Sequence, residues 1–222
     1  MFIGHFAPAF VAATIPRAPR LGLLFVAGQL VDFGFFVFVL LGVEHMRIVP
    51  GITATNPMDL YHMPFTHSLI GGAAWAAAFA AIFWLITKNR TGAIIAAAVV
   101  LSHWLLDILV HRPDMTVFGT APKLGFGLWN APLIEMPLEL GMTGIALGFY
   151  LKRTRAIDGA TFTPAWVLGG MLLLVQCYNW FAPPPATYDI GLPLSALLAF
   201  MLFAWLAFRL DRTRLLKRAG EI

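Results

Sequence analysis

The chain has 222 residues, of which 59% are hydrophobic and 12% are charged, and its mean hydropathy is +0.80. Long uncharged runs with this composition are typical of helical membrane proteins and exclude an ordinary soluble domain. The net charge of +4 and the pI near 9.6 would fit a nucleic-acid binder, but the positions of the basic residues point elsewhere. The single cysteine, Cys177, lies inside an apolar run, so no intrachain disulfide can form.

The apolar runs, taken in chain order, predict one integral membrane domain over residues 1–222. Residues 1–15 are too short to cross a bilayer, and we interpret them as a half-helix that enters the membrane. Residues 1–151 should bear the site, the last two spans within 162–208 should be scaffold, and the basic tail 209–222 should be helical at the membrane surface. The predicted fold class is all-α, a polytopic transmembrane helical bundle of six spans plus a short N-terminal half-helix. The six predicted spans are residues 21–43, 64–87, 91–111, 131–151, 162–181 and 190–208.

The basic residues in the connections orient these spans. Twelve fall on one side of the predicted topology and three on the other, which by the positive-inside rule places both termini in the cytoplasm. The basicity therefore reports membrane topology and affinity for anionic lipid, and nucleic acid is not an expected partner. The twelve are Arg17, Arg20, Lys88, Arg90, Lys152, Arg153, Arg155, Arg209, Arg212, Arg214, Lys217 and Arg218, and the three are Arg47, Arg112 and Lys123.

Three ionisable residues share one face of the third predicted span. His103, Asp107 and His111 are spaced i, i+4, i+8, which stacks them along a helix. A charged group inside a bilayer costs about 2.5–3.5 kcal/mol, so three on one face need a common partner. A metal ion is the simplest partner, and a polar stripe satisfied by a neighbouring helix is the alternative.

Ionisable residues from other segments reach the same depth. Counting about 1.5 Å per helical residue from the nearest cytoplasmic charge places Asp32, His103 and Glu139 about 18–20 Å into the membrane. His5 reaches this depth if the N-terminal segment is a half-helix. The candidates, from the deepest outward, are His5, Asp32, His103, Glu139, Asp107, Glu135, His111 and His67.

These candidates are imidazoles and carboxylates, with no Lys or Arg buried beside them. Such ligands suit zinc, with manganese and iron as alternatives. A bound divalent ion lowers the pKa of a water ligand toward about 7 and so provides a nucleophile for hydrolysis. Glu139 or Glu135 would remain as a general base or to orient a histidine. His45 lies in a loop and is interpreted as solvated, while the composition around His62 leaves its role open.

The order of these residues resembles a known family. His5 is followed by Asp32, then by His-Met-Pro-Phe-Thr-His-Ser at 62–68, and then by Ser-His-Trp-Leu-Leu-Asp at 102–107. This pattern, over about residues 1–115, is similar to that of the bacterial membrane-bound metal-dependent hydrolases, the LexA-regulated inner-membrane hydrolases. That family carries an N-terminal His, an acidic site, a His-Arg-Gly-x-Thr-His-Ser motif and a Ser-His-x-x-x-Asp motif. The resemblance implies a metal-dependent hydrolase of a bacterial inner membrane.

Two departures from the family pattern bear on the site. Met63 and Pro64 replace the Arg-Gly pair of the motif, so the arginine that could bind a phosphate or carboxylate group is missing. Arg112 or Lys123 could supply this contact instead. Phe33 follows Asp32 where a second acidic residue is often found. The absence of this acid favours one metal ion over two.

The leading hypothesis is a membrane-embedded metal-dependent hydrolase that acts on a lipid or lipid-linked ester or phosphoester near the periplasmic leaflet. The loops 44–65 and 112–130 would cover the site. A proton- or metal-coupled transporter is one alternative, although few polar residues, Gln29 and Thr143 among them, lie between the cluster and the cytoplasmic charges. A non-catalytic membrane protein with a structural metal is another. The predicted ligands are His5, Asp32, His67, His103 and Asp107, with Glu139, His62 and His111 as auxiliary ligands or acid–base groups.

Overall fold

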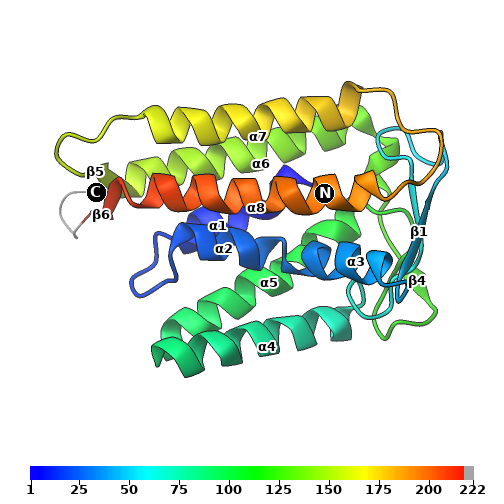
Figure 1. The fold of residues 1–222 in the computed structure, drawn as a ribbon, viewed down its shortest axis with the longest axis horizontal. Coiled ribbons are helices and arrows are strands. Elements are labelled where there is room, and N and C mark those ends of the chain that lie inside the picture. Colours follow the sequence, from blue (N-terminus) through cyan, green and yellow to red (C-terminus); the bar gives the residue numbers. More distant parts are fainter. Residues whose placement is uncertain (218–222) are drawn as a thin grey trace.

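The structure, a computed structural model, describes residues 1–217 and is mostly helical (Figure 1). The long helices run along the longest axis of the molecule, and small two-stranded sheets lie at both of its ends (Figure 1). The elements in chain order are η1 (Ile3–Phe6), α1 (Ala7–Ala12), α2 (Leu21–Gly28), α3 (Leu30–Leu40), β1 (His45–Ile48), β2 (Met58–His62), α4 (Leu69–Thr87), α5 (Arg90–Val110), β3 (Met115–Thr116), β4 (Lys123–Leu124), η2 (Leu128–Asn130), α6 (Pro132–Arg153), β5 (Thr154–Ala156), α7 (Thr163–Phe181), α8 (Gly191–Asp211) and β6 (Arg214–Leu216).

Several helices are long and apolar enough to cross a membrane, which is consistent with a membrane protein. They are α4, α5 and α8, and the bent pair α2–α3 is a fourth if it counts as one span. α6 and α7 have 22 and 19 residues but are not among the helices that meet the hydropathy criterion for a span. The mostly helical fold is thus confirmed, whereas the prediction of six spans is not confirmed.

The three small antiparallel sheets mark the two ends of the bundle. The β1–β2 and β3–β4 hairpins lie at one end, and the β5–β6 pair lies at the other (Figure 1). The connections α1–α2, α4–α5 and α6–α7 also lie at the β5–β6 end (Figure 1). The basic residues that were assigned to one side of the membrane therefore share one end of the fold, apart from Arg218, which lies outside the described residues.

Two predicted boundaries are wrong for local reasons. The second span begins at Leu69 and not near Pro64, because Ser68 caps the helix by accepting the Gly71 amide at 3.0 Å. The five residues from Pro64 to Ser68 therefore stay outside the helix, and they carry His67.

The basic tail was predicted as a helix, and over Arg214–Leu216 it is strand β6, paired with β5. Arg214 is buried at this point and donates to Thr154 Oγ1 at 2.6 Å and to the Leu151 carbonyl at 2.9 Å. Its burial lowers the pKa of the guanidinium. The prediction for residues 218–222 lies outside the described residues.

The first predicted span is broken at Gln29, where α2 and α3 meet at 53°. Gln29 is completely buried, and its amide group donates to the Phe2 carbonyl at 3.1 Å, so the break is held by the N-terminal segment. Gly28 permits this close approach, since a Cβ placed there would lie 2.6 Å from the His5 carbonyl oxygen. The bend directs the first turn of α3, with Asp32, toward α5.

Candidate metal centre

Asp107 is the centre of a buried cluster in which four histidines converge. Its Oδ1 lies 3.0 Å from His5 Nε2 and 3.6 Å from His111 Nε2. Its Oδ2 lies 3.0 Å from His103 Nε2 and 3.6 Å from His67 Nε2. All five side chains are at most 3% exposed. The i, i+4, i+8 spacing thus places His103 of α5 a turn below the carboxylate and His111, the C-cap residue of α5, a turn above it, as the sequence predicted.

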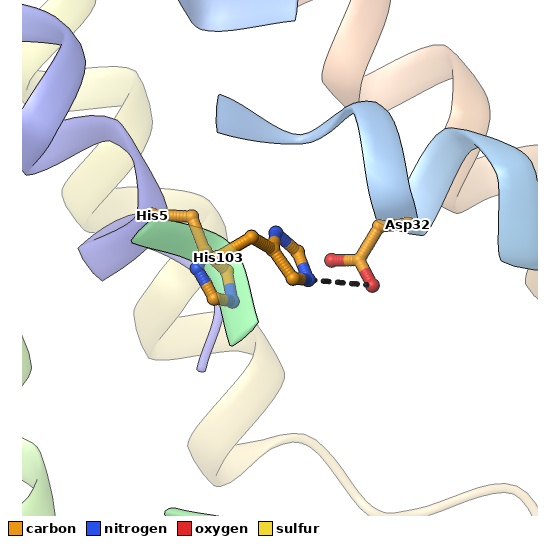
Figure 2. Close-up of side chains that lie close together, drawn as sticks. All are labelled: His5, Asp32 and His103. Carbon is orange, nitrogen blue, oxygen red and sulfur yellow. Dashed lines mark ion pairs between the residues drawn. The ribbon is translucent and has the colours of Figure 1, made fainter. Parts of the chain in front are cut away.

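Asp32 brings a second carboxylate to the cluster from α3. Its Oδ1 lies 3.3 Å from His67 Nε2 and 3.5 Å from His103 Nε2, and the latter contact is drawn in Figure 2. The side chain is 17% exposed, more than any other member of the cluster. The five predicted ligands, together with His111, therefore meet at one place although they come from η1, α3, α5 and the segment before α4.

Hydrogen bonds fix the ring orientation of His103. Its Nδ1 lies 2.8 Å from the Gly28 carbonyl oxygen at the break between α2 and α3. A carbonyl can only accept, so Nδ1 carries the proton and the Nε2 lone pair of the neutral ring faces the two carboxylates. In a continuous helix this carbonyl would accept the Asp32 amide. The break therefore provides the acceptor that orients His103.

His67 is oriented by a buried relay from the loop after α3. Its Nδ1 lies 2.8 Å from Thr66 Oγ1, which donates to Glu44 Oε2 at 2.6 Å. Because the carboxylate is the acceptor of the threonine proton, the threonine oxygen accepts from Nδ1–H of His67. Glu44 also accepts the amides of Phe65 and Thr66, at 2.8 and 3.0 Å, and is completely buried. Glu44 thus holds both the backbone and the ring that presents Nε2.

His111 has a carboxylate as its orienting partner. Its Nδ1 lies 2.8 Å from Asp114 Oδ1, so this ring also presents Nε2 to the cluster. Asp114 Oδ2 lies 3.4 Å from Arg112 Nε, and Arg112 forms a second ion pair with Asp59. A carboxylate behind a histidine fixes the tautomer and raises the basicity of the ligand nitrogen.

The N-terminal segment places His5 beside His103. The two rings are stacked with centroids 3.7 Å apart and planes 8° apart. Glu139 of α6 holds this segment, since its Oε1 accepts the amides of Phe2 and Gly4 at 2.5 and 3.0 Å. The main-chain nitrogen of Met1 also contacts Asp107 Oδ1, at 2.8 Å. His5 therefore depends on contacts from α2 and α6 for its position.

The donor set fits a divalent metal ion. Two overlapping groups, His5–Asp32–His103 and His67–His103–Asp107, each have ligand atoms within 4.8 Å of one another. In a tetrahedral site with bonds of about 2.0–2.1 Å, neighbouring ligand atoms lie about 3.3–3.4 Å apart. The distances from the two carboxylates to the four Nε2 atoms, 3.0–3.6 Å, bracket that value. His103 Nε2 is buried without a hydrogen-bond partner, as a ligand nitrogen would be.

Two of the three predicted auxiliary residues, His62 and Glu139, lie elsewhere, as does the candidate Glu135. His62 is exposed on β2, where its ring stacks on His45 with centroids 5.5 Å apart. Glu139 is buried, but its hydrogen bonds go to the N-terminal segment and to Gln176. Glu135 lies one turn earlier on α6, and its Oε2 is buried without a hydrogen-bond partner. Of the three predicted auxiliary groups, the structure places only His111 in direct contact with the cluster.

The orienting residues were missed from the sequence. Glu44 was taken as the start of a polar loop, although the Thr-His pair at 66–67 signals a hydroxyl beside a ligand ring. Asp114 follows His111 at i+3, a spacing that a search for carboxylate–histidine pairs would have found. No local pattern identifies the Gly28 carbonyl, because its role depends on the break in the chain.

Comparisons of the chain with protein-family models, with curated proteins and with solved structures gave no match.

Proposed function

We propose that the protein is a membrane-embedded, metal-dependent hydrolase, as the resemblance of residues 1–115 to the bacterial inner-membrane hydrolases implies. The observation that carries the proposal is the convergence of four histidine Nε2 atoms and two aspartates in one buried cluster. Uncompensated, two buried carboxylates in low dielectric would be strongly unfavourable. Three of the histidines have an acceptor behind Nδ1, an arrangement typical of metal ligands.

The proposed topology has six spans, α2–α3 and α4 to α8, with the N-terminal segment entering the membrane and both termini cytoplasmic. It is supported by the grouping of the basic connections at the β5–β6 end of the bundle (Figure 1). The bacterial inner membrane is the proposed location. In this orientation the two hairpins β1–β2 and β3–β4 lie on the periplasmic side. A small hollow of about 40 Å³ between them, lined by His62, Asp114 and Lys123, adjoins the carboxylate that orients His111.

The proposed reaction is hydrolysis of a lipid or lipid-linked ester or phosphoester. A divalent ion, with zinc proposed ahead of manganese or iron, supplies Lewis acidity and lowers the pKa of a bound water. His5, Asp32, His67, His103 and Asp107 are the proposed ligands, and Asp114, Glu44 and Gly28 orient the rings. Glu139 is proposed as a positioning residue, because its contacts fix the segment that carries His5. The membrane depth of the cluster is what suggests a lipid substrate.

An aromatic layer supports an enzyme over a transporter. Below the cluster, on the side of the basic connections, Phe6 stacks on Phe25 at 4.3 Å, and Phe10 lies 5.1 Å from Phe25 and 6.0 Å from Tyr150. All four rings are at most 1% exposed. A proton or metal path to that end of the bundle would need polar groups through this layer.

The test is lipid hydrolysis by the purified protein in liposomes of phosphatidylethanolamine and phosphatidylglycerol, loaded with zinc or manganese. We expect released head group or fatty acid by mass spectrometry, lost after chelation and in Asp107→Ala. Proton and metal flux are followed in the same liposomes with pH- and metal-sensitive dyes. Flux without lipid product would overturn the proposal in favour of a transporter. Bound metal with neither product nor flux would overturn it in favour of a structural metal.

A further inference from the structure

The cluster contains more ligands than one ion of the proposed kind uses. Four histidines and two aspartates meet there, whereas a zinc site has about four ligands in total. His111 is the additional member, and its Nδ1 is held by Asp114 in the manner of a ligand ring. The six donors are therefore enough for more than one ion.

The two oxygens of Asp107 divide the donors into two groups. Oδ2 faces His103 at 3.0 Å and His67 at 3.6 Å, and Asp32 Oδ1 lies within 3.5 Å of both of these nitrogens. This first group has four donors, two nitrogens and two oxygens, which is a complete tetrahedral set.

The second group lies on the other oxygen. Asp107 Oδ1 faces His5 at 3.0 Å and His111 at 3.6 Å. The Met1 main-chain nitrogen lies 2.8 Å from the same oxygen. His103 cannot serve this group as well, because its Nδ1 is bound to the Gly28 carbonyl and its single free nitrogen belongs to the first group. The second group therefore has three side-chain donors. An ion bound to them would displace the Met1 nitrogen from Oδ1, and its fourth coordination position would be available to water or substrate.

We infer that the centre binds two divalent ions bridged by Asp107, one held by Asp32, His67 and His103 and the other by His5 and His111. This inference rests on the proposed function and revises the expectation of a single ion. That expectation came from the phenylalanine after Asp32, where a second acid was absent; His111 makes up for the missing ligand. Carboxylate-bridged ions lie about 3.5–4 Å apart in hydrolases of phosphoesters and amides, where they clamp the attacking and leaving oxygens.

The two ion sites have different surroundings. The first is closed by four protein donors between α3, α5 and the segment before α4. The second lies beside His111, whose ring centroid is 4.1 Å from that of Trp129 in η2. The open position is therefore on the side where the hairpins cover the bundle, and we assign water and substrate binding to the second ion.

The experiment measures metal per chain in the full-length protein, purified in detergent without chelator and loaded with zinc or manganese. Mass spectrometry should find two ions in the wild type and one in His111→Gln. Electron paramagnetic resonance of the manganese form should show exchange coupling between two ions in the wild type and an isolated ion in the variant. His45→Gln, an exposed histidine at the same end of the fold, is the matched control and should keep two coupled ions.

Asp32→Asn provides the reciprocal variant, because it removes a ligand of the first ion only. It should lose one ion and the coupling, and circular dichroism with gel filtration will show that each variant is folded. One uncoupled ion in the wild type, unchanged in His111→Gln, would overturn the two-ion inference and leave Oδ1 as the acceptor of the Met1 main-chain nitrogen. That result would leave the proposed hydrolase intact, whereas a wild type without metal would overturn both.

Discussion

His103 of α5 donates a hydrogen bond of 2.8 Å to the carbonyl of Gly28, at the point where the first span is broken. The break and the ligand therefore depend on each other. The bend frees a backbone acceptor and directs Asp32 to the cluster, and the acceptor fixes which nitrogen of His103 faces the aspartates. A backbone irregularity inside a membrane is otherwise unfavourable, since unsatisfied polar groups cannot reach water.

Gly28→Ala should displace the N-terminal segment. The added Cβ would lie 2.6 Å from the His5 carbonyl oxygen, and this backbone atom cannot move without moving the His5 ring. We expect a lower melting temperature in detergent and weaker metal binding by equilibrium dialysis. Gly72→Ala is the control, because a Cβ there meets nothing within 4 Å. Equal metal affinity of Gly28→Ala and the wild type would contradict the assigned role of the N-terminal segment.

Glu44→Gln should lower the affinity for metal, although Glu44 is not a proposed ligand. The carboxylate accepts the Thr66 hydroxyl and two backbone amides, and an amide group has only one oxygen to replace the two that it uses. Loss of such an orienting partner lowers metal affinity by about 10–100-fold. Competition with a fluorescent zinc chelator will measure the change. Asp158→Asn, an exposed carboxylate at the other end of the bundle, should bind metal like the wild type.

The role of Glu139 can be determined by comparing two substitutions. Its Oε1 accepts the Phe2 and Gly4 amides, and glutamine retains an acceptor oxygen at this position while alanine does not. A positioning role therefore predicts near-normal metal binding and lipid hydrolysis in Glu139→Gln, and reduced metal binding in Glu139→Ala. A general base predicts normal metal content in Glu139→Gln with lipid hydrolysis abolished. Metal content and lipid product, measured on the same preparations, distinguish the two roles.

Tyr150→Phe should affect stability and leave the metal centre unchanged. The Tyr150 hydroxyl donates to Asp211 at 3.0 Å, near the C-terminal ends of α6 and α8, which precede β5 and β6. Its loss should cost about 1 kcal/mol, which lowers the melting temperature of a chain of this size by about 2–4 °C. Tyr178→Phe, an exposed side chain, is the control. A loss of metal in Tyr150→Phe would show that the aromatic layer and the cluster are not independent.

Hydrophobic periodicity and the positions of charged residues predicted those features of the fold that depend on a single helix. The span predicted at 91–111 is α5, Arg90–Val110, and the spacing within it correctly placed His103, Asp107 and His111 on one face. Depth counting also brought Asp32 from another helix to the same level, because helical rise is constant. These inferences needed only the geometry of a single helix and the thickness of a bilayer.

The remaining features depend on contacts between distant segments. The 53° bend at Gln29 is held by the Phe2 carbonyl, which lies 27 residues away in the chain. Glu44 reaches Thr66 across the β1–β2 hairpin, and no periodic pattern announces either partner. His62 and His67 lie in one short motif, yet one is exposed on a strand and the other is buried in the cluster. The two histidines differ in burial because strand β2 ends at His62, whereas His67 directly precedes Ser68, the residue that caps α4.

The decisive measurement is the metal content of the detergent-purified protein, wild type beside His103→Ala and Asp107→Ala. We expect a stoichiometric divalent transition metal in the wild type and its loss in both variants while they remain folded by gel filtration and circular dichroism. A wild type that binds no metal, even after loading with zinc, manganese and iron, would show that the cluster is not a metal centre. The buried histidines and aspartates would then have to be explained as a proton-carrying network.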